Sequence, residues 1–211
     1  MYRSVSKRPR SVWSLFVLFS GCATMSPEEC LQANWEEVGY NDAAEGYAMS
    51  RSAEHREACA DTGVSVDFEL YRNGYSLGLP YYCTRETAFE TADHGGAFAT
   101  QCTRETFPDY ALGYSEGREV YALKSQRSEL QAAIDDKAAQ SNALLTQIAV
   151  LRETRDDPEA TKDTRQQARY QQTQLEALYR ALYDEIEQLE DERDDISVAI
   201  DSRIAAFYGS L

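Results

Sequence analysis

The clearest hydrophobic pattern lies in the C-terminal half of the chain, where apolar residues recur every seven positions. One series precedes Pro158 and one follows it: Leu123, Leu130, Leu144, Leu151, then Leu175, Leu182, Leu189, Ile196. Heptad spacing of apolar residues is typical of coiled coils. The single break at Asp156-Asp157-Pro158 therefore predicts an antiparallel hairpin of two long helices within residues 108–211. Polar residues in the seam are expected to set its register: Lys137, Ser141, Arg193 and Arg203.

Residues 22–107 have a different pattern, in which cysteines and turn residues separate short helical stretches. Ser26-Pro27-Glu28-Glu29 is a typical helix start and predicts a helix over 27–46. Further helices are expected from Ser52 to Cys59 and from Asp67 to Leu79, where Pro80 would end the second. Residues 80–107 are expected to be a loop with room for a small β-hairpin. The predicted fold class is mainly α, a small disulfide-bonded helical head followed by the long helical hairpin.

A tyrosine–glycine spacing recurs along the chain. Tyr71-x-x-Gly74-Tyr75-x-x-Gly78 returns as Tyr110-x-x-Gly113-Tyr114-x-x-Gly117, and a weaker copy runs from Trp35 to Ala43. Glycines four apart lie on one helix face and each costs about 1 kcal/mol relative to alanine, so close helix packing is expected. We favour three such helices in one compact core over a ligand groove lined by rings. The candidate ligand face comprises Trp35, Tyr40, Asp42, His55, Tyr71, Tyr75 and Tyr114.

Residues 1–21 have the pattern of a secretory signal peptide. Four basic residues up to Arg10 precede an apolar stretch over Val12–Phe19, which is shorter than the roughly 20 residues of a membrane span. Phe19-Ser20-Gly21-Cys22 follows and resembles the lipobox of bacterial lipoproteins, although Phe19 stands where an aliphatic residue is usual. The alternative is an ordinary signal peptide followed by an unrelated cysteine.

The lipobox resemblance implies a location and an anchor. In lipoproteins the chain is cut before the cysteine, here Cys22, which then carries acyl chains that hold the protein on a membrane. Ala23 follows Cys22, in place of the aspartate associated with inner-membrane retention. The resemblance therefore implies the cell envelope, at the periplasmic face of the outer membrane.

The charge of the chain narrows the choice of partners. Removing the four signal-peptide bases from 21 leaves 17 basic against 36 acidic side chains, a net charge of −19. Such a chain is not suited to nucleic acid or to a polybasic mode of membrane binding. Stable attachment to a membrane would therefore depend on two or more acyl chains.

Four cysteines remain besides Cys22: Cys30, Cys59, Cys83 and Cys102. An even number of cysteines in an oxidising compartment predicts disulfides, and three connectivities are possible. We favour adjacent pairing because it closes the shorter loops. A zinc site is less favoured, since the C-x-x-C spacing of such sites is missing.

The front part of the chain resembles a family of Gram-negative lipoproteins, domain of unknown function 2799. The resemblance covers about residues 25–120 and is carried by Cys30, Trp35, Gly39-Tyr40-x-Asp42, Gly46, His55-Arg56-x-x-Cys59, Gly63, Asp67, Tyr71, Gly74, Gly78-Leu79, Tyr82-Cys83 and Cys102. Ala43 stands where the family has a second glycine. The resemblance implies an envelope compartment and disulfides, and it implies no activity.

Residues that could support chemistry are few and have structural explanations. His55 and Cys59 share a helix face, but Cys59 is expected in a disulfide; His94 lies in a predicted loop, and Asp67 is a helix cap. No hydrolase, zinc-protease or phosphate-loop motif is present, so we expect neither a cofactor nor a metal, and we rank an enzyme third. The first hypothesis is an envelope interaction protein whose coiled-coil arm contacts a partner protein or a second copy. The alternative is a ligand- or glycan-binding module that uses the Tyr/Gly-rich head.

Overall fold

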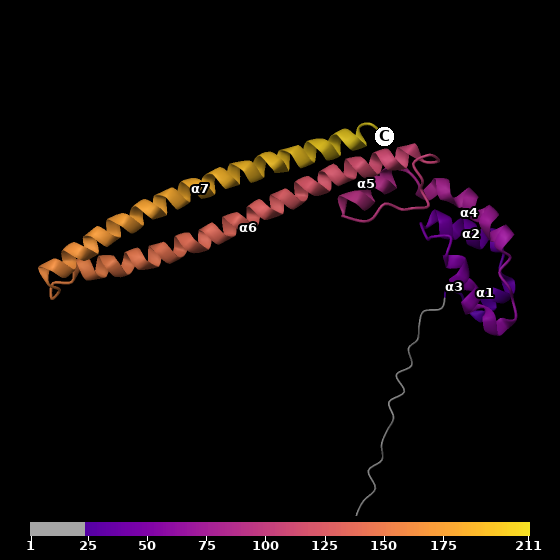
Figure 1. The fold of residues 1–211 in the computed structure, drawn as a ribbon, viewed down its shortest axis with the longest axis horizontal. Coiled ribbons are helices and arrows are strands. Elements are labelled where there is room, and N and C mark those ends of the chain that lie inside the picture. The colour runs from indigo at the N-terminus through magenta and orange to yellow at the C-terminus, as the bar shows by residue number, and fades with distance from the viewer. Residues whose placement is uncertain (1–23) are drawn as a thin grey trace, which may run out of the picture. The chain divides into compact units, whose positions relative to one another are not determined.

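The computed structural model describes residues 24–211, which contain seven α-helices, one short 3-10 helix and no strand (Figure 1). The predicted signal peptide and Cys22 lie outside the described residues. The described chain divides into two compact units, the first ending at Leu79 and the second formed by Pro80–Leu211. Composition alone placed the boundary at residue 108, because it grouped all four cysteines in one head. The mainly α fold with a long helical hairpin is confirmed.

The first unit is built from short helices. It contains α1 (Pro27–Gln32), α2 (Trp35–Ala44), α3 (Arg51–Ala58), the 3-10 turn η1 (Ala60–Thr62) and most of α4 (Phe68–Tyr82). The start of α1 is the predicted one, since Ser26 and Glu29 each accept a hydrogen bond from the other's backbone N–H. The predicted single helix over 27–46 is wrong, because Ala33 is extended and ends α1.

The end of α4 also differs from the sequence expectation. Pro80 lies inside the helix, which continues to Tyr82. A proline within the last turn removes only one backbone hydrogen bond, which explains why the helix tolerates it there.

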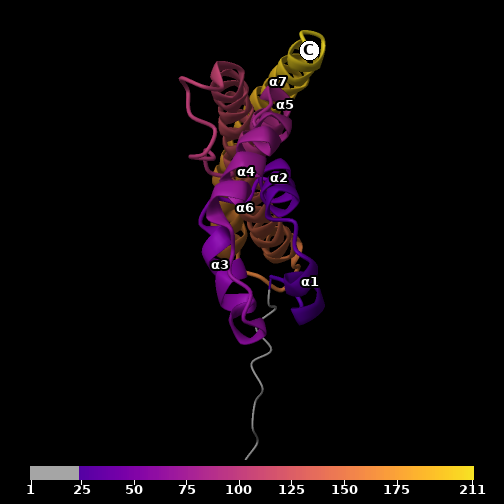
Figure 2. The same cartoon turned by 90° about the vertical axis from the view of Figure 1, so that its right-hand side faces the viewer.

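Glycines bring α2 and α4 into backbone contact. A Cβ atom on Gly74 would lie 1.7 Å from the carbonyl oxygen of Glu36, and one on Gly78 would lie 2.2 Å from that of Tyr40. Gly39 on α2 meets the carbonyl oxygen of Tyr71 in the same way, at 2.0 Å. Figures 1 and 2 show the two helices side by side. The predicted close approach is confirmed for this pair.

The core of the first unit surrounds that contact. Trp35, Ala43, Tyr71 and Tyr75 are buried there together with the Cys30–Cys59 disulfide. This is the adjacent pairing favoured from the sequence. The bond joins the end of α1 to the loop before α4, so the short helices are held by a covalent link as well as by a small apolar core.

The second unit contains three helices: α5 (Arg85–Asp93), α6 (Pro108–Asp156) and α7 (Lys162–Tyr208). The prediction of a loop or β-hairpin over 80–107 is wrong, because α5 lies inside this range. The side chain of Thr84 caps it by accepting a hydrogen bond from the N–H of Thr87. The second disulfide joins Cys83 to Cys102, which again is the adjacent pairing.

Helices α5 and α6 pack through the same kind of contact as α2 and α4. A Cβ atom on Gly113 would lie 2.1 Å from the carbonyl oxygen of Arg85, and one on Gly117 would lie 2.3 Å from that of Phe89. The prediction that three small-faced helices share one core is therefore corrected. Of the two helices with the Tyr-Gly spacing, α4 packs against α2 and α6 packs against α5.

The two helix pairs are copies of one motif. Each first helix ends in a turn with a glycine at positive φ, Gly46 in one copy and Gly95 in the other. The second ring of each Tyr-Gly segment then closes that turn. Tyr75 donates its hydroxyl proton to the carbonyl oxygen of Tyr47 at 2.7 Å, and Tyr114 donates to that of Gly96 at 3.0 Å. A disulfide links the residues before each first helix to the loop before each second one.

Beyond the second copy, α6 and α7 form the predicted antiparallel hairpin, which is confirmed (Figure 1). Helices of 49 and 47 residues are each about 70 Å long at 1.5 Å per residue. The base of the hairpin has an apolar cluster with Phe89 of α5, where the rings of Phe89 and Phe207 stack at 3.8 Å.

The seam of the hairpin is only partly apolar. Its buried positions include Ile134, Ser141 and Ile148 on α6, with Gln172 and Leu182 on α7. The leucines singled out from the sequence on α6 are half-buried companions of these residues: Leu123, Leu130, Leu144 and Leu151.

Polar pairs cross the hairpin and fix its register. Lys137 pairs with Glu185, Arg203 pairs with Glu119, and Arg193 donates a hydrogen bond to Gln131 at 3.0 Å. Exposed pairs of this kind contribute at most about 1 kcal/mol each, so they align the helices more than they stabilise them.

Candidate functional site

A buried polar network lies inside the first unit, centred on the carboxylate of Asp42. Its Oδ2 atom accepts hydrogen bonds from the Tyr71 hydroxyl and from His55 Nε2, both at 2.7 Å. Its Oδ1 atom lies 3.2 Å from Arg51 Nε, an ion pair that is not aligned as a hydrogen bond. Burial, and then the bond to Asp42, raise the pKa of Tyr71, which keeps this phenol a hydrogen-bond donor. In this network, one buried carboxylate is paired with Arg51 and accepts hydrogen bonds from two other side chains inside a small core.

The second nitrogen of His55 connects this network to the start of the described chain. Nδ1 lies 2.8 Å from the hydroxyl oxygen of Thr24, and the next residue, Met25, is buried in the core. Both ring nitrogens of His55 are thus engaged within the protein, Nε2 on Asp42 and Nδ1 on Thr24. The arrangement fastens Thr24 and Met25 to the folded unit.

The second copy of the motif has the same helix pair without this network. Thr91 takes the place of Asp42, as shown by the turn hydrogen bonds Tyr47 N–H to Asp42 O and Gly96 N–H to Thr91 O, both 2.8 Å. Tyr47 and Tyr71 are 24 positions apart, whereas Gly96 and Tyr110 are 14 apart. The extra residues of the first copy include α3, which supplies Arg51 and His55. The helix pair and its turn are therefore present in the second copy without the network.

A surface hollow of about 510 Å³ lies beside the network, and its rim is rich in carboxylates. Glu37, Glu45 and Asp42 line it together with Arg51 and His55. Asp42 and His55 already bond to each other, so the hollow offers mainly exposed acidic groups at its rim. Among residues 24–211, no three His, Cys, Asp or Glu side chains are placed to hold a metal ion.

The residues expected on a ligand face do not form one surface. Trp35, Tyr71 and Tyr75 are 6%, 0% and 1% exposed, and they pack in the core of the first unit. Tyr114 belongs to the second unit, and its hydroxyl is bonded to Gly96. The structure brings together Asp42, His55 and Tyr71, but as buried partners of one another.

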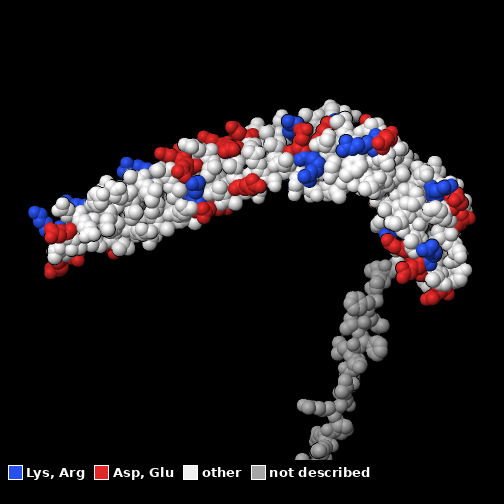
Figure 3. Space-filling view, in the orientation of Figure 1, with Lys and Arg blue, Asp and Glu red and all other residues white. Residues whose placement is uncertain are grey.

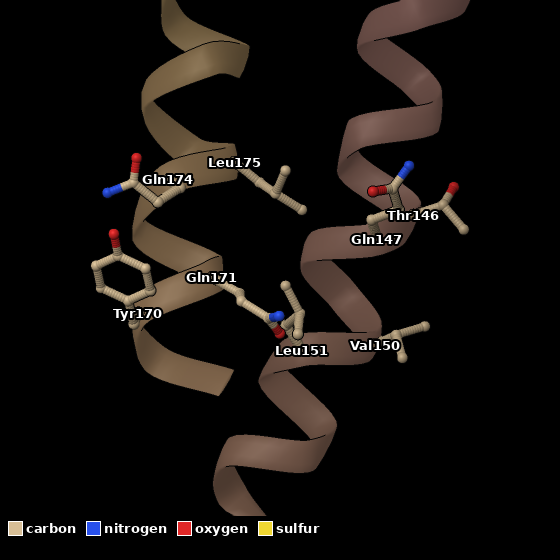
Figure 4. A pocket seen from close by; sticks show the side chains of 8 residues that line it. All are labelled: Thr146, Gln147, Val150, Leu151, Tyr170, Gln171, Gln174 and Leu175. Atoms are coloured by element: carbon tan, nitrogen blue, oxygen red, sulfur yellow. The ribbon is translucent and has the colours of Figure 1, made fainter. Parts of the chain in front are cut away.

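A second candidate site lies on the outer part of the hairpin, and sequence reasoning missed it. It is a groove of about 500 Å³ in which Leu151 and Leu175 lie between the two helices (Figure 4). Val150 on α6 and Tyr170 on α7 border it on opposite sides. We call the complete lining the distal groove; it consists of Thr146, Gln147, Val150, Leu151, Tyr170, Gln171, Gln174 and Leu175.

The distal groove is apolar and uncharged. None of its eight lining residues carries a charge, and Val150 and Tyr170 are 57% and 67% exposed. Contiguous apolar surface on the outside of a protein can mark an interaction site. Val150 and Tyr170 lie beside the heptad positions, so the heptad pattern alone does not predict that they line a groove.

Comparison with known families locates a domain within the chain. Residues 34–121 match the family model described as "Protein of unknown function (DUF2799)". This part of the chain is similar to that family. The resemblance seen in the sequence is therefore confirmed, whereas the lipoprotein nature of the chain stays a prediction. Searches of curated proteins and of solved structures found no match.

The limits of the match follow the duplicated motif. The match begins directly before α2 and ends at Tyr121, shortly after Gly117 on α6. Helices α2, α4 and α5 and the first part of α6 thus lie inside it, while most of the hairpin lies outside it. Within residues 24–211, no helix is long and apolar enough to cross a membrane.

Proposed function

We propose that this chain is a lipid-anchored protein of the cell envelope, held by acyl chains on Cys22 at the periplasmic face of the outer membrane. In this proposal the part similar to DUF2799 is the folded base, and the α6–α7 hairpin beyond it is an arm that binds another protein surface. The proposal concerns an interaction protein, and no reaction is assigned to it.

The N-terminal contacts support an anchor next to the folded base. Thr24, the first described residue, is bonded to His55, Met25 is buried, and one residue of the sequence, Ala23, lies between Cys22 and Thr24. Acyl chains on Cys22 would hold the first unit directly against the membrane surface. The network of Asp42 and His55, which the second copy lacks, would then keep the attachment point fixed relative to α3.

The hairpin is the observation that carries the interaction role. Its helices extend far past the apolar cluster at Phe89, and over their outer part α6 and α7 are each other's partner (Figure 1). That outer part has a half-buried seam and the distal groove. The ligand-binding alternative loses support because three of the rings on which it rested, Trp35, Tyr71 and Tyr75, are buried.

Changing Cys22 to serine tests the anchor. We expect the C22S chain to accumulate uncut and to incorporate no labelled palmitate, because the thiol is the acylation site that the lipobox resemblance implies. An Ala23→Ser variant is the matched control and should be labelled and processed normally. Palmitate label that persists in C22S would contradict the proposal, as would C22S protein that remains in the membrane fraction after correct cleavage.

Shortening the arm tests its role. Lys137 and Glu185 pair across the hairpin, so residues 138–183 can be replaced by a short Gly-Ser linker that joins neighbouring helix ends. The base should stay folded, because Phe89, Val120 and Phe207 are retained. We expect the envelope phenotype of this strain to equal that of a strain lacking the whole chain, at unchanged protein level and location. Wild-type behaviour of the shortened chain would contradict an interaction role for the arm.

A further inference from the structure

We propose that the arm binds a second copy of itself, and that the distal groove is the contact surface. This inference rests on the proposed function, since it names the partner of the arm. Two copies would overlap along their outer segments around a two-fold axis, and the two hairpins would form a four-helix contact there.

The composition of the distal groove is typical of a surface that contacts another protein. Leu151 and Leu175 are half-buried between the helices, and the exposed Val150 and Tyr170 extend the apolar surface to both sides (Figure 4). Amide side chains of Gln147 and Gln174 also line it and could hydrogen-bond across a contact. A two-helix hairpin covers only one side of its seam leucines, and a second hairpin covers the other side.

Charge indicates that the partner is another copy. The whole chain has a net charge of −15, but residues 138–183 contain six basic and six acidic side chains. Residues 138–151 contain no charged side chain at all, and Figure 3 shows few charges on one face of the arm behind its tip. The neighbouring stretch Asp184–Asp195 has eight acidic residues and one arginine, Arg193. Two acidic chains would repel each other elsewhere along the arm, so the neutral outer segment is where self-contact is least opposed.

Symmetry makes such a contact possible with one surface. In a two-fold dimer each copy presents the same patch to the other, so no second complementary surface is required. The distal groove is neutral, apolar at its centre and bordered by amides, so two copies of it can face each other without charge repulsion. A basic partner protein would instead favour the acidic stretch Asp184–Asp195, which lies outside the distal groove.

Photo-crosslinking of the full chain in its native membrane tests the proposal. Tyr170 is replaced by benzoylphenylalanine in one strain, and Tyr183 is replaced in the control strain. Both are exposed tyrosines of α7, 67% and 56% accessible, and only Tyr170 lines the distal groove. We expect a crosslinked product that contains two copies of this chain, identified by mass spectrometry, from Tyr170 alone.

The other outcomes overturn self-association in distinguishable ways. A Tyr170 adduct with a different protein rejects the second copy as partner but leaves the arm as an interaction element. No adduct from Tyr170, or equal self-adducts from both positions, rejects the distal groove as the contact. The truncation of residues 138–183 separately decides whether the arm is needed at all.

A charge in the groove provides an independent readout. Sedimentation of the full chain purified in detergent should show a dimer that Val150→Glu weakens about tenfold or more, because each dimer would bury two unpaired carboxylates. Val198→Glu is the control, since Val198 is 69% exposed on α7 and lies outside the groove. A wild-type chain that is monomeric at every concentration, or equal effects of both variants, would overturn the proposal.

Discussion

Replacing Gly74 by alanine is expected to separate α2 from α4 and to lower the free energy of unfolding of the first unit by about 2–3 kcal/mol. The added Cβ atom would lie 1.7 Å from the carbonyl oxygen of Glu36, a backbone atom that cannot rotate away. Alanine gains about 1 kcal/mol of helix propensity over glycine, but this gain is smaller than the cost of moving two helices apart.

Hydrogen exchange of the full chain measures this change in α2 and α4 separately from the hairpin. Ser76→Ala on the same helix is the control, because Ser76 is exposed and its hydroxyl only bonds to the carbonyl oxygen of Arg72. Protection of α2 should fall in G74A and stay unchanged in S76A. Equal protection in the two variants would show that the helices do not touch at Gly74.

The glycine contacts show what could be predicted from the sequence and what could not. The Tyr-Gly spacing of α4 and α6 predicted close packing, because a glycine pair inside a helix is costly unless a neighbour approaches. The partner of α6 was not predictable in the same way. Helix α5 presents Ala88 and Ala92 to its neighbours and has no glycine, so it lacks the spacing that marked the other helices.

The buried network illustrates a second limit. Asp42 and His55 were singled out as candidate ligand-face residues, but their meeting depends on how α3 docks. The sequence placed them on two separate helices with nothing to indicate their mutual distance. Tyr71 was a candidate for the ligand face, and it is the buried donor to Asp42. The direction in which these side chains point came only from the fold.

The hairpin was the best predicted element, because its information is local and repeated. Heptad spacing specified two helices, Pro158 specified one turn, and chain order made them antiparallel. The distal groove was not predictable, since it depends on Val150 and Tyr170, which lie beside the heptad positions. The heptad pattern therefore predicted which residues lie between the two helices, but it did not predict the groove on the outer surface of the hairpin.

A carboxylate placed inside the hairpin seam is expected to unfold the outer arm. Leu182 is 8% exposed on α7, and losing a buried leucine costs about 1.5–3 kcal/mol, to which Leu182→Asp adds several kcal/mol for burying an unpaired charge. The base keeps its own cluster of Phe89, Val120 and Phe207, so the two parts should respond differently.

Far-UV circular dichroism and hydrogen exchange of the full chain should therefore show a large loss of helix in Leu182→Asp, confined to the outer parts of α6 and α7. The control is Leu178→Asp, because Leu178 is 54% exposed on the same helix and its charge can stay in water at a cost below about 1 kcal/mol. Loss of helix in both variants would mean that the effect is one of charge and not of burial. Intact helix in both would mean that the seam contributes little, and that the outer arm is held together by contacts other than those between α6 and α7.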